Sequence, residues 1–127
     1  IYEKNIPVLG ICLGMQLMGK AFNGEIKNIG SSNHDNLNTY VHYINIDKNS
    51  KLFDIIKKEK ILVNSRHQDH LTKTKLDITS FSEDNIIESI ENKNKNFFIG
   101  VQWHPESIND ENSKKLFNEF FKEIKNK

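Results

Sequence analysis

The sequence predicts a single α/β domain, and three observations support this fold class. Short apolar runs rich in β-branched residues, typical of buried strands, alternate with segments of helical periodicity. The segment 109–127 carries apolar side chains at helical spacing, which is typical of an amphipathic helix. The 127 residues contain no internal repeat and no linker, so one compact domain is expected.

The first half of the chain alternates strand and helix signals. The run "IPVLGIC" at 6–12 predicts a buried strand, and residues 14–22 predict a helix that packs on a sheet and ends at Asn23-Gly24. A polar, turn-rich stretch at 28–39 predicts a loop. Three more elements are predicted in this half: a strand at 40–47, a short helix at 50–56 with Ser50 as its N-cap, and a strand at 60–65.

The second half predicts a strand meander followed by a helix. Its strands are "LDITSFS" at 76–82, "IIESIE" at 86–91 and "FFIGVQW" at 97–103, with a tight "EDN" turn between the first two. Apolar side chains recur at helical spacing in the tail, at Leu116, Phe117, Phe120, Phe121 and Ile124. We therefore expect this helix to lie on the sheet.

Composition argues against several classes of function. The net charge is +1 and lysines are scattered among acidic residues, so no strong field favours nucleic acid or a membrane surface. The only cysteine, Cys12, excludes an internal disulfide, and without a signal peptide a reducing, cytoplasmic setting is expected. No P-loop or dinucleotide fingerprint is present, so no cofactor is expected. His34, His42 and His70 lack metal-ligand spacing and are expected to be solvated, so no metal is expected either.

Cys12 stands between Gly10 and Gly14, after an apolar run and before a helix. A strand, then Gly-x-Cys-x-Gly, then a helix is the pattern of a nucleophile elbow. The nucleophile of such a turn has strained backbone angles, and we expect both glycines to be pressed against neighbouring backbone. The sulfur would lie at a helix N-terminus, which favours a thiolate. The alternative is that Cys12 is a small core residue between two packing glycines.

A thiol nucleophile needs a base, and the best candidate is His104 in "GVQWHPES". It follows an apolar strand, and α/β folds place functional groups at strand ends. Glu106 is two residues further on, so in extended chain its carboxylate would lie on the same side and could hold the imidazole in one tautomer. Pro105 biases His104 toward extended backbone. The alternative is a strand-end histidine beside a surface glutamate.

Together the two motifs resemble class I glutamine amidotransferases, which use a Cys-His-Glu triad. "PVLGICLGMQLM" is similar to their nucleophile elbow and "IGVQWHPE" to their His-x-Glu segment. Between these motifs, "VNSRHQDHL" and "ITSFSEDNIIESIE" resemble the branch of γ-glutamyl-GABA hydrolase-like enzymes, and the Trp in "QWHPE" also favours that branch. The resemblance covers nearly the whole chain and implies a three-layer α/β sandwich.

The resemblance also implies roles for individual residues. Cys12 would attack the γ-carbonyl of a glutamyl group and form a thioester, His104 would transfer the proton, and Glu106 would orient His104. The backbone N–H of Leu13 would be an oxyanion donor. The positions that match substrate contacts are Gln16, Ser65 and His67. This sequence has Arg66-His67-Gln68-Asp69 where the branch often has two adjacent histidines followed by Gln, which leaves the specificity contacts open.

The resemblance further implies that an N-terminal half precedes the elbow and supplies a second oxyanion donor. We therefore expect 1–127 to be the C-terminal portion of one amidotransferase-like domain, with an unprotected sheet edge, and to be inactive alone. Such a chain could pair as a homodimer or with its missing half.

The favoured function is a hydrolase of small γ-glutamyl amides. The alternative is a glutaminase unit that delivers ammonia to a synthase partner, and a third possibility is a non-catalytic remnant. Nucleic acid and membranes are not expected as partners.

Overall fold

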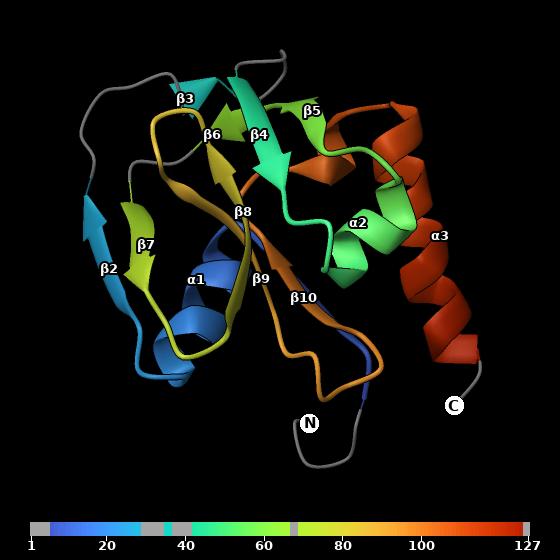
Figure 1. Ribbon diagram of the computed structural model, residues 1–127, viewed down its shortest axis with the longest axis horizontal. Coiled ribbons are helices and arrows are strands. Elements are labelled where there is room, and N and C mark those ends of the chain that lie inside the picture. Colours follow the sequence, from blue (N-terminus) through green and yellow to red (C-terminus); the bar gives the residue numbers. More distant parts are fainter. Residues whose placement is uncertain (1–5, 29–34, 37–41, 67–68, 126–127) are drawn as a thin grey trace.

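The computed structural model describes residues 6–28, 35–36, 42–66 and 69–125 (Figure 1). Its main feature is a six-stranded mixed sheet. The strands in spatial order are β1 (Val8–Ile11), β10 (Phe98–Val101), β9 (Ile87–Glu91), β8 (Asp77–Ser82), β4 (His42–Ile46) and β5 (Lys60–Val63). β1 pairs with β10 in parallel, and the other neighbours are antiparallel. The predicted meander is therefore confirmed for β8, β9 and β10.

Helices cover both faces of this sheet, as Figure 1 shows. On one face, α1 (Leu13–Ala21) packs together with a ribbon of β2 (Glu25–Asn28) and β7 (Asp69–Lys73). On the other face, α2 (Lys51–Ile56) and α3 (Glu111–Lys125) pack together. The core is accordingly split into two clusters, one around Met15 and Ile90 and one around Ile99 and Leu116. The three-layer α/β sandwich is confirmed.

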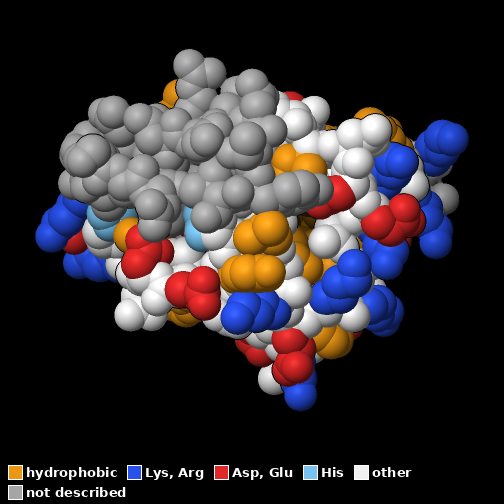
Figure 2. Space-filling view, turned by 90° about the horizontal axis from the view of Figure 1, so that it is seen from above, with side chains coloured by type: hydrophobic (Ala, Val, Ile, Leu, Met, Phe, Trp, Pro, Cys, Tyr) orange, Lys and Arg blue, Asp and Glu red, His pale blue; other side chains and the backbone are white. Residues whose placement is uncertain are grey.

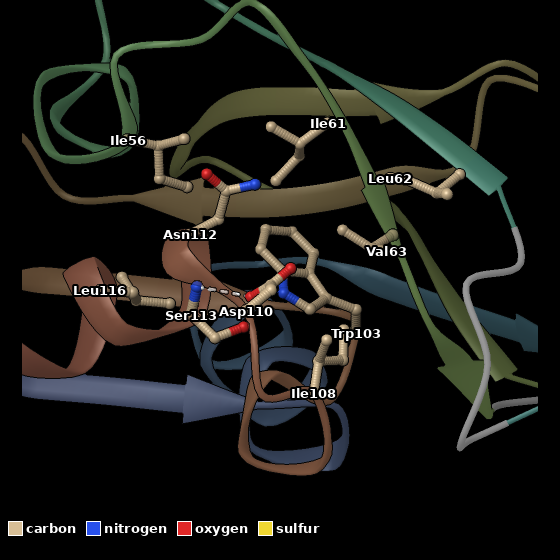
Figure 3. A pocket seen from close by; sticks show the side chains of 10 residues that line it. All are labelled: Ile56, Ile61, Leu62, Val63, Trp103, Ile108, Asp110, Asn112, Ser113 and Leu116. Carbon is tan, nitrogen blue, oxygen red and sulfur yellow. Dashed lines mark hydrogen bonds between the residues drawn. The ribbon is translucent and has the colours of Figure 1, made fainter.

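The two helices of the second face begin at side chains that cap them. The hydroxyl of Ser50 accepts the N–H of Phe53 at 2.9 Å, so the predicted N-cap of α2 is confirmed. The carboxylate of Asp110 accepts the N–H of Ser113 at 2.9 Å at the start of α3, as the dashed line in Figure 3 shows. The amphipathic tail therefore forms its helix as predicted.

Four short strands depart from the predictions. The sequence pattern predicts no strand where β2 and β7 lie, yet these two strands pair with each other beside α1. β3 (Asp35–Asn36) falls inside the predicted loop at 28–39, as does Asn28 at the end of β2. The predicted strand at 60–65 is split, because β5 ends at Val63 and β6 (Ser65–Arg66) turns away to pair with β3. These strands are defined by distant partners rather than by local pattern.

β1 lies at an edge of the sheet in the part of the chain that the structure describes, where its only strand partner is β10. Beside it, α1 exposes Leu13 and Leu17, at 62% and 57% of their surface. On the face shown in Figure 2, Lys and Arg side chains are interspersed with Asp and Glu. None of the described helices has both the length and the apolar character that crossing a bilayer requires.

Candidate active site

Cys12 occupies a sharp turn between β1 and α1. Its backbone has φ 52° and ψ −105°, a conformation that is strained for a residue with a Cβ. The N–H of Cys12 continues the β1–β10 ladder by donating to the carbonyl of Val101 at 2.8 Å. The carbonyl of Cys12 accepts the N–H of Gln16 at 3.0 Å and so begins the helix. The strained strand-to-helix turn expected from the sequence is therefore present.

The two glycines that flank this turn have different reasons to be glycine. A Cβ on Gly10 would lie 2.3 Å from the sulfur of Met18 and 3.0 Å from the carbonyl carbon of Gly14. A Cβ on Gly14 would meet no described atom within 4 Å. The expectation that both glycines are pressed against backbone is therefore wrong for Gly14. The close approach is between Gly10 in β1 and the residues Gly14 and Met18 of α1.

His104 and Glu106 form a hydrogen-bonded pair beyond the end of β10. Nδ1 of His104 lies 2.6 Å from a carboxylate oxygen of Glu106. Nε2, on the other side of the ring, therefore points away from Glu106. His104 has φ −109° and ψ 83°, outside the helical region, as expected for a residue before proline. The chain then turns in a 3-10 helix, Pro105–Ser107. The sequence suggested that His104 and Glu106 would meet along extended chain. Their contact is instead made across this turn.

Asn64 holds the backbone of His104 from both sides. Its side-chain oxygen accepts the N–H of His104 at 3.0 Å, and its side-chain nitrogen donates to the carbonyl of His104 at 3.0 Å. Asn64 is fully buried, directly after β5. The Asn64 amide thus reaches across the fold and fixes the backbone position from which the imidazole of His104 extends.

Gln102 connects the elbow to the strand that carries His104. Its Nε2 lies 3.6 Å from the sulfur of Cys12, and its Oε1 accepts from Nε2 of Gln16 at 3.3 Å. Gln102 is fully buried and Gln16 is 4% exposed. Sequence reasoning treated Gln102 only as part of a strand, although its position two residues before His104 in the same motif was a usable signal.

The surroundings of Cys12 act on its thiol in opposite directions. Burial raises the pKa of the Cys12 thiol above its usual 9.0, and the carboxylates of Glu106 and Glu88 raise it further. The backbone N–H of Leu13 and the side chain of Gln102 lower it. The helix N-terminus therefore supports the thiolate as expected, but burial outweighs it. A nearby base is needed to take the proton at neutral pH.

The remaining candidate residues are partly outside the described chain. Ser65 is in β6, where only its backbone is described, and His67 and His34 lie outside the described residues. His42 was expected to be solvated, and this is wrong. Its ring lies 3.0 Å from the Glu88 carboxylate, and the two side chains are 9% and 1% exposed. Within the described residues, no group of three or more His, Cys, Asp or Glu side chains is arranged to hold a metal.

A small cavity lies behind the site, between β5 and α3. Trp103, the residue before His104, is 2% exposed and lines it together with Val63 and Ile108 (Figure 3). Its volume is about 10 Å³, which is at most the room of one water molecule. This cavity therefore is no substrate site, and Trp103 instead packs the strand end against the helix layer.

Cys12, His104 and Glu106 thus lie beyond the carboxyl ends of two adjacent parallel strands, β1 and β10. This is the edge where open α/β sheets bind ligands. Because the two strands pair in parallel with Ile11 opposite Val101, the segments that follow them leave the sheet at the same edge. The negative charge of Glu106 is one of the causes that raise the pKa of the Cys12 thiol.

Comparison with known proteins agrees with this arrangement. A GMP synthase (glutamine-hydrolysing) of Francisella tularensis is 34% identical over 122 residues, which cover 94% of this chain but 22% of that protein. A glutamine amidotransferase-like protein of Rickettsia prowazekii is 33% identical over 157 residues, covering 85% of this chain and 56% of that protein. The chain therefore spans only part of the length of these relatives.

The fold is shared with solved structures. A Thermoplasma acidophilum protein, named for one of the subunits of GMP synthase, superposes with a TM-score of 0.79 at 17% identity, over 98% of this chain and 60% of that chain. The peptidase C26 family matches residues 1–106. The chain therefore belongs to the peptidase C26 family, a family of class I glutamine amidotransferase-like proteins.

Proposed function

We propose that this chain carries the centre that hydrolyses the γ-amide of glutamine, and that the ammonia is delivered to a synthase partner. One observation carries the proposal. A cysteine on a strained strand-to-helix turn follows the end of β1, and a His–Glu pair with a 2.6 Å contact follows the end of its parallel neighbour β10. This is the constellation of a base-assisted thiol nucleophile.

The proposed reaction proceeds through a thioester. His104 Nε2 takes the thiol proton as the sulfur of Cys12 attacks the γ-carbonyl carbon, and the same proton passes to the departing amide nitrogen, which leaves as ammonia. A water then attacks the thioester with His104 as base, which releases the glutamyl carboxylate and restores the thiol. Glu106 keeps Nδ1 protonated and stabilises the imidazolium in both steps.

The proposed binding contacts follow from the resemblance and from local geometry. The backbone N–H of Leu13 lowers the pKa of the Cys12 thiol, and it is proposed to donate to the oxyanion of the tetrahedral intermediate. Gln16, Ser65 and His67 are proposed to contact the glutamyl part of the substrate. Of these, Gln16 is one helical turn beyond Cys12 in α1.

The relatives favour a synthase-linked role over a free-standing one. Matches that cover 94% of this chain carry the name GMP synthase (glutamine-hydrolysing), and the chain corresponds to 22% of their length. This supports a glutaminase portion that acts with a synthase partner. We place the reaction in the cytoplasm, where a lone thiol nucleophile stays reduced.

A free-standing hydrolase of small γ-glutamyl amides is the second candidate. It was the function that the sequence favoured, on the resemblance of "VNSRHQDHL" and "ITSFSEDNIIESIE" to that branch, and the peptidase C26 match fits it as well. The two candidates share the chemistry of Cys12 and differ in what receives the released amine.

The nucleophile is tested by Cys12→Ser in the complete protein, with ammonia release from glutamine as the measurement. Only one atom changes, so the fold should persist while hydrolysis is lost. Activity within about tenfold of the parent would contradict the assignment.

The partner is tested by assaying glutamine and a γ-glutamyl amide with and without the synthase. Ammonia release that the synthase stimulates supports the first candidate. Partner-independent turnover of the γ-glutamyl amide would favour the second.

A further inference from the structure

Gln102 is placed beside the nucleophile by the register of two strands. β1 and β10 pair in parallel with Ile11 opposite Val101. One residue further along, Cys12 stands opposite Gln102, and equivalent positions on parallel neighbours point to the same face. The backbone N–H of Gln102 donates to the carbonyl of Glu88 at 2.7 Å, which fixes this position from the other side.

The amide of Gln102 is oriented by Gln16. Nε2 of Gln16 donates to Oε1 of Gln102 at 3.3 Å. The other end of the amide, Nε2, then faces the sulfur of Cys12 at 3.6 Å, within the range of a hydrogen bond to sulfur. Both glutamines are buried, so water does not compete for these contacts.

The two hydrogen bonds, from Gln16 to Gln102 and from Gln102 to the Cys12 sulfur, both donate toward the sulfur, which favours a thiolate. Gln16 donates to Gln102, and an amide that accepts at its oxygen is polarised to donate more strongly at its nitrogen. That nitrogen faces the atom that gains negative charge when the thiol loses its proton. Glu88 and Glu106 are the charged groups that oppose this ionisation, and Leu13 supplies the other donor.

We propose that Gln102 is a catalytic residue that holds the Cys12 sulfur and stabilises its thiolate by hydrogen bonding, with Gln16 as the positioning residue that orients the Gln102 amide. The proposal rests on the proposed function of Cys12. It gives Gln16 a role in the nucleophile's environment in addition to its proposed contact with substrate.

The test measures the thiol itself. The rate of alkylation of Cys12 by iodoacetamide is followed against pH in the complete protein and in Gln102→Met, which has similar length but no donor. A hydrogen bond to a charged group contributes enough that the pKa of the thiol should rise by about one unit in the variant, and alkylation below that pKa should slow about tenfold. Gln102→Glu should raise the pKa further, because it places a carboxylate beside the sulfur.

Two more variants separate this role from a structural one. Gln16→Met leaves Nε2 of Gln102 beside the sulfur but removes the group that orients it. This variant should therefore raise the thiol pKa, by less than Gln102→Met does. Thr79→Val removes another buried polar group of the same sheet, whose hydroxyl lies 2.7 Å from that of Ser89, and should leave the thiol pKa unchanged.

The proposal is overturned if the thiol pKa is the same in the parent, Gln102→Met and Gln102→Glu, or if Thr79→Val shifts it equally. If Gln102→Met does not fold, Gln16→Met decides in its place, since an unchanged pKa there would also overturn the proposal. These readouts need no turnover. Failure of the proposed function would instead appear as activity that survives Cys12→Ser.

Discussion

Cys12 holds a backbone conformation that few residues with a side chain adopt, and its neighbours account for this. A strained φ of this kind costs on the order of 1–3 kcal/mol. The β1–β10 ladder fixes its N–H, and the first turn of α1 fixes its carbonyl. The surrounding structure therefore over-determines the turn, and the sulfur projects where two strands end. This is the physical reason to assign it chemistry rather than packing.

At the same scale, Glu106→Gln should lower kcat strongly while the fold persists. A carboxamide fills the same space but no longer stabilises the imidazolium or fixes the ring tautomer, so a loss of about 10²-fold or more is expected. Steady-state ammonia release from glutamine in the complete protein is the measurement, and His104→Ala should lose at least as much. A silent Glu106→Gln beside an inactive His104→Ala would show that the centre is a Cys–His dyad.

The residues of the site differ in how far sequence could predict them. The sequence singles out Cys12, His104 and Glu106 as candidates because each lies in a short motif, and their catalytic roles stay predictions. Gln102 and Asn64 were not singled out from the sequence because the residues they contact lie 90 and 40 positions away along the chain. The contacts of Gln102 and Asn64 depend on strand register and on which strand ends meet, and a local sequence pattern specifies neither.

At the scale of elements, the elbow predicts opposite outcomes for its two glycines. Gly10→Ala would place a Cβ 2.3 Å from the Met18 sulfur and 3.0 Å from the carbonyl carbon of Gly14, so the Met18 side chain must move and the start of α1 must shift slightly. A loss of about 1–3 kcal/mol in the free energy of unfolding is expected. Gly14→Ala adds a methyl group into open space near the start of a helix and is the matched control.

For Gly14→Ala we expect unchanged or slightly higher stability, by up to about 1 kcal/mol, because Ala favours helix more than Gly. Urea unfolding of the two variants side by side is the measurement. Equal losses in both would show that the helix start is crowded from both sides, contrary to the geometry.

The start of α2 predicts a pH dependence of stability. Its first backbone N–H groups, from Lys51 and Leu52, donate to the buried Glu91 carboxylate at 2.9 and 3.0 Å. Burial raises the pKa of Glu91 above its usual 4.5, although these two hydrogen bonds oppose the shift. The native state then holds this proton more tightly than the unfolded chain does.

The contribution of Glu91 to stability is therefore fully present below its usual pKa and is lost as pH rises through its raised, native value. Glu91→Gln removes this titration. The free energy of unfolding of the parent should fall relative to that of the variant as pH rises from below 4.5. Urea unfolding at a series of pH values measures this difference, and a difference that grows in favour of the parent would contradict the prediction.

Helices and strands could be predicted from sequence where the interactions that define them lie within a few residues of one another. α2 has its cap, Ser50, within the segment itself, and β1 is an apolar run of ordinary strand composition. β2 and β7 each contain one strongly apolar residue, Ile26 and Leu71, so neither shows an alternating pattern. They are strands because they pair with one another against α1, a cause that no local window contains.

At the scale of the whole molecule, the sheet is covered on both faces but open along β1. The two core clusters bury the side chains of β10 on both faces, as expected for a strand in the interior of a sheet. In the described part of the chain, β1 has β10 as its only strand partner. Among the described residues no strand pairs with the other side of β1, which is where a further strand could add.

This geometry predicts that residues 1–127 on their own self-associate through the side that carries β1 and α1. Leu17, 57% exposed on α1, is the side chain that tests it. Burying one leucine at an interface contributes about 1.5–3 kcal/mol, so Leu17→Lys should weaken association at least about tenfold. Ile124→Lys is the matched control, because Ile124 is 47% exposed on α3, on the opposite layer. Sedimentation velocity over a range of concentrations measures both variants. A chain that stays monomeric throughout, or an equal effect of Ile124→Lys, would show that this side has no special tendency to pair.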